Sequence, residues 1–305
     1  MRLTAMLVTL IVIACGLSIP PTSVSGNPQT PQMVILNVRV KDPQGKAVMD
    51  VPQSSFLVSE NGVPQKISLF MNEQIPLSYG LLIDCSGSAK SHLEHVIRAS
   101  MKIVNSNKPG DEAFLIRFIS SDKIEKVLDL TSDKKALTDG LDSLYVEAGQ
   151  TAILDAIYLG ADHLAKAKMD NTLRRRALII ATDGEERNSY YNAQQLIQLL
   201  TSTDIQVFII AFTDKLKKEK HLKAVKLVTV LATDTGGRAY LPASVAELDR
   251  IANEIINDIR TQYVIGYVPS GGSNKSFQKV EVSVADNPNQ EKRVAVTRVG
   301  YSTQK

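Results

Sequence analysis

The sequence predicts an α/β fold with a doubly wound, mostly parallel sheet and further β-rich segments on both sides of it. In residues 76–262, apolar runs of strand length alternate with longer stretches of helical periodicity, which is typical of a helix-covered parallel sheet. Residues 33–75 and 263–305 instead contain short alternating segments separated by Gly, Pro and Asn, which indicates β structure. A chain of 305 residues suits one large domain with additions or two smaller domains.

The central region has strand-like apolar runs, which lie at residues 78–84, 113–120, 176–182 and 205–212. Most of them are nearly continuous, as expected for strands that helices cover on both faces. Helical spacing appears in residues 93–104 and 153–164 and is clearest in a last helix, whose apolar face consists of Leu248, Ile251, Ile255 and Ile259. Ser244 and Glu247 have the spacing of a capping box, so we expect one at the start of this helix.

The flanking segments are expected to contain short strands. Strand patterns occur at residues 34–40, 55–58, 65–71, 263–268, 279–284 and 294–298. Asn61 and Gly62 have the composition of a tight hairpin turn. The C-terminal strands form a hairpin or a three-stranded tail in this interpretation, and pairing with the N-terminal β unit is a hypothesis. One shared domain and two separate ones both remain open.

The first 26 residues have the pattern of an export signal. Arg2 gives a positive start, residues 5–17 are apolar, and Pro20 and Pro21 precede small residues. The apolar run is short for a membrane span. We therefore expect an exported protein, located in the periplasm, in the cell envelope or outside the cell. The alternative is a buried N-terminal helix or strand.

Two processing sites compete within this signal. Cys15 ends the tetrapeptide Val-Ile-Ala-Cys, which resembles a bacterial lipobox, and lipidation there would tether the protein to a membrane. Cleavage near Ser25 or Gly26 would instead release it. Cys85 is the only other cysteine, so an intramolecular disulfide is not expected. The net charge of +3 also argues against a nucleic-acid partner.

Oxygen-bearing side chains follow several of the predicted elements. Asp84 ends the first central strand, Ser86 and Ser88 follow it, and Asp183 comes directly after a later strand. Thr151 stands at the start of a predicted helix. Because the carboxyl ends of parallel strands meet at one edge of a sheet, these groups converge there. Hydroxyl and carboxylate oxygens suit a hard divalent cation such as Mg²⁺.

These five positions resemble the von Willebrand factor A family, whose metal-ion-dependent adhesion site consists of Asp-x-Ser-x-Ser, a distant Thr and a distant Asp. The resemblance covers roughly residues 76–262, and the C-terminal Arg-Val-Gly-Tyr ending at position 301 is similar to a bacterial group of this family. It implies that Ser86 and Ser88 bind Mg²⁺ or Mn²⁺ directly, Thr151 directly or through water, and Asp84 and Asp183 largely through water. Cys85, Ala89 and Gln150 depart from the family pattern, and Gln150 bears on the geometry of the Thr151 loop.

Each of these residues also has a purely structural interpretation. Asp84 and Thr151 have the composition of helix caps, and the two serines that of turn residues. Asp155 is expected to stabilise its helix start or to bond to the Thr151 loop, and Cys85 is expected to be buried and inert. The lysine-rich run at residues 215–223 is interpreted as a solvated helix face. Contact with anionic lipid or with an acidic partner is the alternative. His92 and His95 are expected on an exposed helix turn.

The sequence thus predicts an exported, non-enzymatic binding protein that captures an acidic side chain of a partner protein through a divalent cation. A purely structural envelope module is one alternative. A metal-dependent hydrolase is another, but no histidine is placed to activate Ser86. A nucleotide-binding fold is disfavoured because Gly87 stands alone, without a glycine-rich phosphate loop.

Overall fold

The computed structural model describes residues 33–167, 172–271, 275–286 and 292–303. Residues 32–305 form one compact unit. The predicted export signal and Cys15 lie outside the described residues. Among those that are described, none of the helices combines the length and the apolar character needed to cross a bilayer.

The centre of the fold is a six-stranded sheet with the order β10-β9-β8-β5-β6-β7. Its strands are β5 (Leu77–Asp84), β6 (Glu112–Ser120), β7 (Lys123–Thr131), β8 (Arg175–Thr182), β9 (Ile205–Ala211) and β10 (Arg238–Tyr240). Neighbouring strands run parallel except for β7, which is antiparallel to β6. The predicted α/β fold with a mostly parallel sheet is confirmed.

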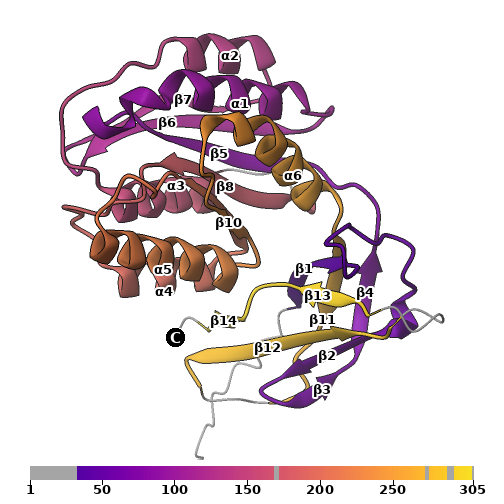
Figure 1. The fold of residues 1–305 in the computed structure, drawn as a ribbon. Coiled ribbons are helices and arrows are strands. Elements are labelled where there is room, and N and C mark those ends of the chain that lie inside the picture. Colours follow the sequence, from indigo (N-terminus) through magenta and orange to yellow (C-terminus); the bar gives the residue numbers. More distant parts are fainter. Residues whose placement is uncertain (1–32, 168–171, 272–274, 287–291, 304–305) are drawn as a thin grey trace, which may run out of the picture. The chain divides into compact units, whose positions relative to one another are not determined.

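Helices cover both faces of this sheet (Figure 1). One layer contains α1 (Leu93–Asn105), α2 (Lys134–Asp142) and α6 (Leu248–Arg260), and the other contains α3 (Ile153–Lys166), α4 (Ala193–Ser202) and α5 (Lys218–Asp234). Two apolar cores result, one on each face of the sheet. All eight residues of β5 are buried, as expected for a strand between two helical layers.

The edge strand β7 was not among the predicted strands. Its sequence is rich in charged residues, and most of its positions are exposed or half-buried. It therefore lacks the apolar run of a central strand and forms because it returns from β6 in an antiparallel hairpin. Such a strand is recognised by its pairing partner more than by its own composition.

The capping-box prediction for the last helix is wrong. A 3₁₀ turn at Val245–Glu247 precedes α6 and moves the helix start to Leu248, so the Ser244 side chain makes no capping bond. Glu247 instead accepts a hydrogen bond from the backbone of Ala243 at 2.8 Å. A complete capping box does occur at the start of α4, between Asn192 and Gln195.

The remaining strands form two antiparallel sheets, β13-β1-β11-β4 and β14-β12-β2-β3. They are β1 (Val34–Lys41), β2 (Phe56–Glu60), β3 (Val63–Gln65), β4 (Ile67–Met71), β11 (Tyr263–Tyr267), β12 (Phe277–Val284), β13 (Val294–Val296) and β14 (Gly300–Ser302). N-terminal and C-terminal strands share each sheet, since β1 pairs with β11 and β2 with β12. Asn61 and Gly62 turn between β2 and β3 with positive φ angles of 51° and 82°, as their composition predicts.

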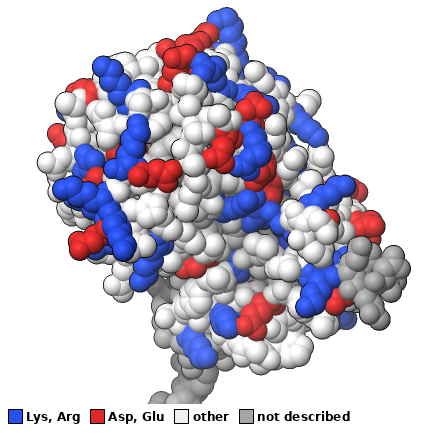
Figure 2. Space-filling model, viewed as in Figure 1, with Lys and Arg blue, Asp and Glu red and all other residues white. Residues whose placement is uncertain are grey.

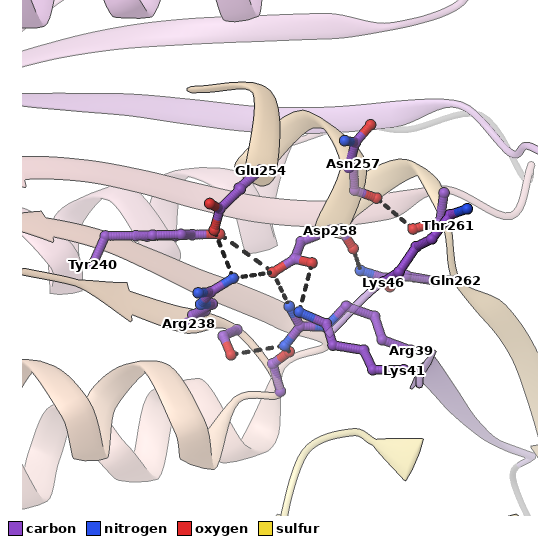
Figure 3. Close-up of polar contacts among 12 residues, drawn as sticks. Arg39, Lys41, Lys46, Arg238, Tyr240, Glu254, Asn257, Asp258, Thr261 and Gln262 are labelled. Atoms are coloured by element: carbon purple, nitrogen blue, oxygen red, sulfur yellow. Dashed lines mark hydrogen bonds and ion pairs between the residues drawn. The ribbon is translucent and has the colours of Figure 1, made fainter. Parts of the chain in front are cut away.

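A buried arginine connects β1 to the helical layer (Figure 3). The Arg39 guanidinium contacts Asp258 of α6 at 2.5 Å and donates to the carbonyls of Gly236 and Gly237 at 2.8 and 2.9 Å. Lys41 binds the second carboxylate oxygen of Asp258 at 3.0 Å. The Asp258 carboxylate therefore pairs with two cations of β1, Arg39 and Lys41.

Candidate metal centre

Two aspartates leave the central sheet at the same edge. β5 and β8 are parallel neighbours with Ile83 opposite Ala181, so the residues that follow these strands emerge side by side. Asp84 ends β5, and Asp183 comes directly after β8. This is the arrangement expected from parallel pairing, in which strand ends and the loops after them form a crevice.

Three hydroxyl groups connect to form a chain at this edge. The Oγ atoms of Ser86 and Ser88 are 3.1 Å apart. Thr151 comes from the loop before α3, and its hydroxyl donates to Ser86 Oγ at 3.1 Å. Ser86 and Thr151 are fully buried, whereas Ser88 is exposed. The chain thus runs from the interior of the edge to its surface.

The structural interpretation of Thr151 as a helix cap is wrong, and the Ser86 side chain does not cap a helix either. Ser86 occupies the N-cap of a 3₁₀ turn but makes no side-chain capping bond. The N-cap of α3 is Ala152, not Thr151, and it also lacks a side-chain cap. Glu186 supplies the missing acceptor for α3 by accepting from the backbone of Leu154 at 3.0 Å. The Thr151 hydroxyl is therefore free to face Ser86.

Asp84 is a buried carboxylate with neutral donors. It accepts from the backbone N–H of Ser86 at 2.9 Å and from the hydroxyl of Thr182 at 2.8 Å. Burial and, to a smaller extent, the nearby charge of Asp183 together raise the pKa of Asp84 to about 6, against the lowering effect of these hydrogen bonds. Two carboxylates that disfavour each other's charge in this way would both be stabilised by a cation.

Asp183 carries an oxygen without a hydrogen-bond donor. One carboxylate oxygen accepts from the backbone of Glu185 at 3.0 Å, but Oδ2 is buried and has no hydrogen-bond partner. The nearest cation, Arg187 Nη2, is 3.6 Å away. A buried carboxylate oxygen that lacks a donor costs stability, and a cation or a metal-bound water would satisfy it.

The chemistry of these groups fits a hard divalent cation bound by hydroxyls, carboxylates and water. Within the described ranges, no cluster of three or more His, Cys, Asp or Glu side chains could hold a metal. A cation at this edge would therefore depend on the hydroxyls of Ser86, Ser88 and Thr151 in addition to the two aspartates.

Asp155 lies in the first turn of α3, where an acidic side chain stabilises the helix start, as expected. Its carboxylate accepts the hydroxyl of Ser121 in the β6–β7 turn and the backbone N–H groups of Tyr190 and Tyr191, the latter two at 2.8 Å. Within the described residues, the Asp155 carboxylate makes no hydrogen bond to the Thr151 loop. Asp155 thus fixes the loop that follows Asp183 against α3, which positions the edge without touching the three hydroxyls.

The positions that depart from the family pattern leave the edge intact. Cys85 is fully buried against the α1, α2 and α6 layer, and burial raises the pKa of its thiol to about 12. It is therefore an inert core residue, as expected. Gln150 is exposed, and Thr151 still reaches Ser86. His92 was expected on an exposed helix turn, but it is half-buried. Its ring stacks on the Phe212 ring, with 4.1 Å between the two ring centroids.

Sequence reasoning missed three residues that shape this edge: Thr182, Glu186 and Arg187. Thr182 precedes Asp183 at a strand end, and a pair of polar residues in that position could have indicated that both belong to the site. Glu186 and Arg187 lie in the loop after Asp183 and had no such pattern, because their roles come from contacts with α3 and Asp183.

The raised pKa of Asp84 gives a testable pH dependence. A carboxyl whose folded pKa is about 6, against an ordinary value of 3.8, stabilises the fold as pH falls through 6. Between pH 7 and pH 5 the metal-free protein should gain about 1 kcal/mol from this group. Thermal unfolding of wild type and Asp84→Asn over this range measures the difference. Parallel pH profiles for the two proteins would contradict the assignment.

The fold and the edge can be compared with known proteins. The family model of the von Willebrand factor type A domain matches residues 80–254. A search of the curated proteins found no match. Among solved structures, an aerotolerance-related membrane protein from Bacteroides fragilis is 21% identical, with 59% of this chain and 98% of that chain covered and a TM-score of 0.47.

A second solved structure is proximal thread matrix protein 1 from the mussel byssus, described with a zinc-occupied MIDAS motif. It is 16% identical, 66% of this chain and 49% of that chain are covered, and the TM-score is 0.51. At this identity the likeness shows the fold alone. The family model, in contrast, spans more than half of the 305 residues. The chain therefore belongs to the von Willebrand factor type A domain family.

Proposed function

We propose that this protein is a metal-dependent protein-binding module that captures an acidic group of a partner through a divalent cation, Mg²⁺ or Mn²⁺. The observation that carries the proposal is the convergence of three hydroxyls and two carboxylates at one sheet edge, where Asp183 Oδ2 is buried and has no hydrogen-bond donor. Membership of the family supports it, since a divalent site of this type is typical of such domains. The byssus protein of the same fold is described with zinc in its MIDAS motif.

The proposed roles follow from position and charge. Ser86 and Ser88 would bind the cation directly, Thr151 directly or through water, and Asp84 and Asp183 largely through water. Hydroxyl ligands carry no charge, so the bound cation would keep the electrophilicity needed to accept a carboxylate from outside. Ser88 is the exposed end of the hydroxyl chain, which leaves the partner a side from which to approach.

A binding role is favoured over hydrolysis by the surroundings of Ser86. Its hydroxyl contacts the hydroxyls of Ser88 and Thr151 and interacts with the Asp84 carboxylate, and among the described residues it contacts no histidine. The His92 ring stacks on Phe212, and the His221 ring contacts the carbonyl of Thr213. A serine nucleophile needs a base within hydrogen-bond reach, and neither histidine contacts this serine.

The proposed location is outside the cytoplasm. The support is the N-terminal pattern of Arg2, an apolar stretch and small residues. Lipidation at Cys15 and cleavage near Ser25 are alternative outcomes, which the mass of the N-terminal peptide of the mature protein would distinguish. A lipidated Cys15 would also be the proposed means of membrane attachment.

Capture of a single carboxylate tests the function directly. A fluorescent peptide with one Asp in a Gly/Ser sequence should bind in Mg²⁺ or Mn²⁺ and be released by chelator, as measured by anisotropy. Asp84→Asn should abolish this binding, because the site loses one of its two acids. Asp139→Asn, an exposed aspartate on α2, is the matched control and should bind as wild type does. Metal-independent binding, or none to any acidic peptide, would leave a structural module as the better description.

A further inference from the structure

A lysine-rich patch lies beside the proposed metal edge. We define it as Lys215, Lys217 and Lys218, in the loop after β9 and at the start of α5; all three are exposed. The Lys215 ammonium is 3.2 Å from the hydroxyl of Ser91, in the same loop as Ser86 and Ser88. Figure 2 shows Lys and Arg side chains gathering over the part of the surface where α5 lies. The patch and the metal edge are thus neighbours.

Close packing joins the start of α5 to the loop that carries Asp183. Gly184 has a φ of +79°, and a Cβ on it would lie 2.7 Å from Thr213 Cγ2. The His221 ring of α5 contacts the carbonyl of the same Thr213 at 3.1 Å. Lys220 of α5 forms an ion pair with Glu185. The patch is therefore held in a fixed place relative to Asp183.

The lysine patch stands at the electrostatically unfavourable end of its helix. Helix N-termini carry partial positive charge and favour acidic residues or capping oxygens. Here the N-cap is Lys217, without a side-chain capping bond, and Glu219 is the only acid in the first turn. In α2, by contrast, Asp133 caps the first turn through two bonds. Departures from the usual charge and capping preferences of a helix start, without a gain in stability, are typical of functional surfaces.

The positive charge of the patch is not neutralised by ion pairs with the residues that the structure describes. No ion pair joins Lys215, Lys217 or Lys218 to another residue in the described part of the sequence. The hydroxyl of Thr213, directly before this stretch, is buried and has no hydrogen-bond partner. Asp214 and Glu219 are exposed in the same stretch, but in the described part of the chain neither forms an ion pair with these three lysines. The stretch therefore keeps an excess of positive charge beside the proposed metal edge.

We propose that the partner binds as a polyacidic segment: one carboxylate occupies the metal edge and neighbouring acidic side chains pair with Lys215, Lys217 and Lys218. This rests on the proposed metal-dependent capture and specifies the chemistry of its partner. The metal edge selects a carboxylate, and the patch selects segments in which that carboxylate has acidic neighbours. Surface ion pairs are individually weak, so the patch contributes by number and by steering the encounter.

Two peptides separate the patch from the metal edge. One carries a single Asp in a Gly/Ser sequence, and the other carries the same Asp with Glu residues on both sides. With Mg²⁺ and low salt, wild type should bind the second about ten-fold more tightly. Lys215→Gln/Lys217→Gln/Lys218→Gln should remove this difference and leave the affinity for the single-Asp peptide and for Mg²⁺ unchanged.

A matched triple variant controls for net charge. Lys135→Gln/Lys166→Gln/Lys279→Gln removes three exposed lysines on α2, α3 and β12 and should bind both peptides as wild type does. Equal affinity of wild type for the two peptides, or equal weakening by both triple variants, would overturn the proposal. Patch-dependent binding to phosphatidylserine vesicles without a preference for the polyacidic peptide would also overturn it, in favour of a membrane surface. Absence of metal-dependent binding to both peptides would refute the capture function itself.

Discussion

Ser86→Ala/Ser88→Ala is expected to abolish measurable binding of Mg²⁺ and Mn²⁺, with a loss of affinity on the order of 100-fold or more. The two hydroxyls are 3.1 Å apart and form the centre of the oxygen cluster, with Thr151 bonded to the first of them. Removing them leaves the Thr151 hydroxyl and two aspartates, which in the proposed site act largely through water. Calorimetric titration and the metal-dependent shift in the unfolding temperature both measure this change, since a ligand that binds only the native state raises its stability.

The control for this double variant is the metal-free protein. Neither hydroxyl bonds to a backbone group, so the apo form should unfold within about 1 kcal/mol of wild type. Ser143→Ala makes a comparison away from the site, because its exposed hydroxyl bonds to the carbonyl of Gly140 in α2 and not to the oxygen cluster. If the double variant retained metal affinity within three-fold of wild type, the assignment of the serines as ligands would be wrong.

Asp258→Ala is expected to destabilise the fold by about 3–5 kcal/mol, because it leaves a buried cation without its partner. Arg39 is 3% exposed, and burial lowers the pKa of its guanidinium more than Asp258 raises it. Lys41 and Arg238 also approach the same carboxylate, at 3.0 and 3.8 Å, and the Tyr240 hydroxyl donates to it at 3.3 Å. The close-up in Figure 3 shows these groups converging on one side chain. Denaturant unfolding measures the loss.

A second aspartate of α6 provides the control for this effect. Asp249 pairs with Lys102 at 2.6 Å, but its side chain is 76% exposed, so Asp249→Ala should cost less than about 1 kcal/mol. Arg39→Met in the Asp258→Ala background should recover part of the lost stability, because it removes the unpaired buried charge. A loss below 1 kcal/mol for Asp258→Ala would show that water or Glu254 compensates Arg39.

The residues of the candidate metal centre could be found in the sequence because the order of strands in a parallel sheet brings the residues at the strand ends together. A buried parallel strand shows itself as an apolar run, and the residue after it must lie at the carboxyl edge of the sheet. Asp84 and Asp183 follow two such runs, β5 and β8, that pair directly. The bonds that tune these residues, such as that from Thr182 to Asp84, depend on which strands are neighbours and were not visible.

The sequence by itself determined the fold class, most central strands and the five oxygen-bearing positions, since apolar periodicity and turn chemistry are local properties of the chain. Only the tertiary structure decided that β7 forms on a charged segment, that Asp155 holds the 190–191 loop, and that β1 and β11 share a sheet. It also decided that Lys215, in the loop before α5, lies beside Ser91. These features depend on contacts between residues far apart in the chain, and periodicity along the chain carries no record of which distant partner a charged or edge residue will meet.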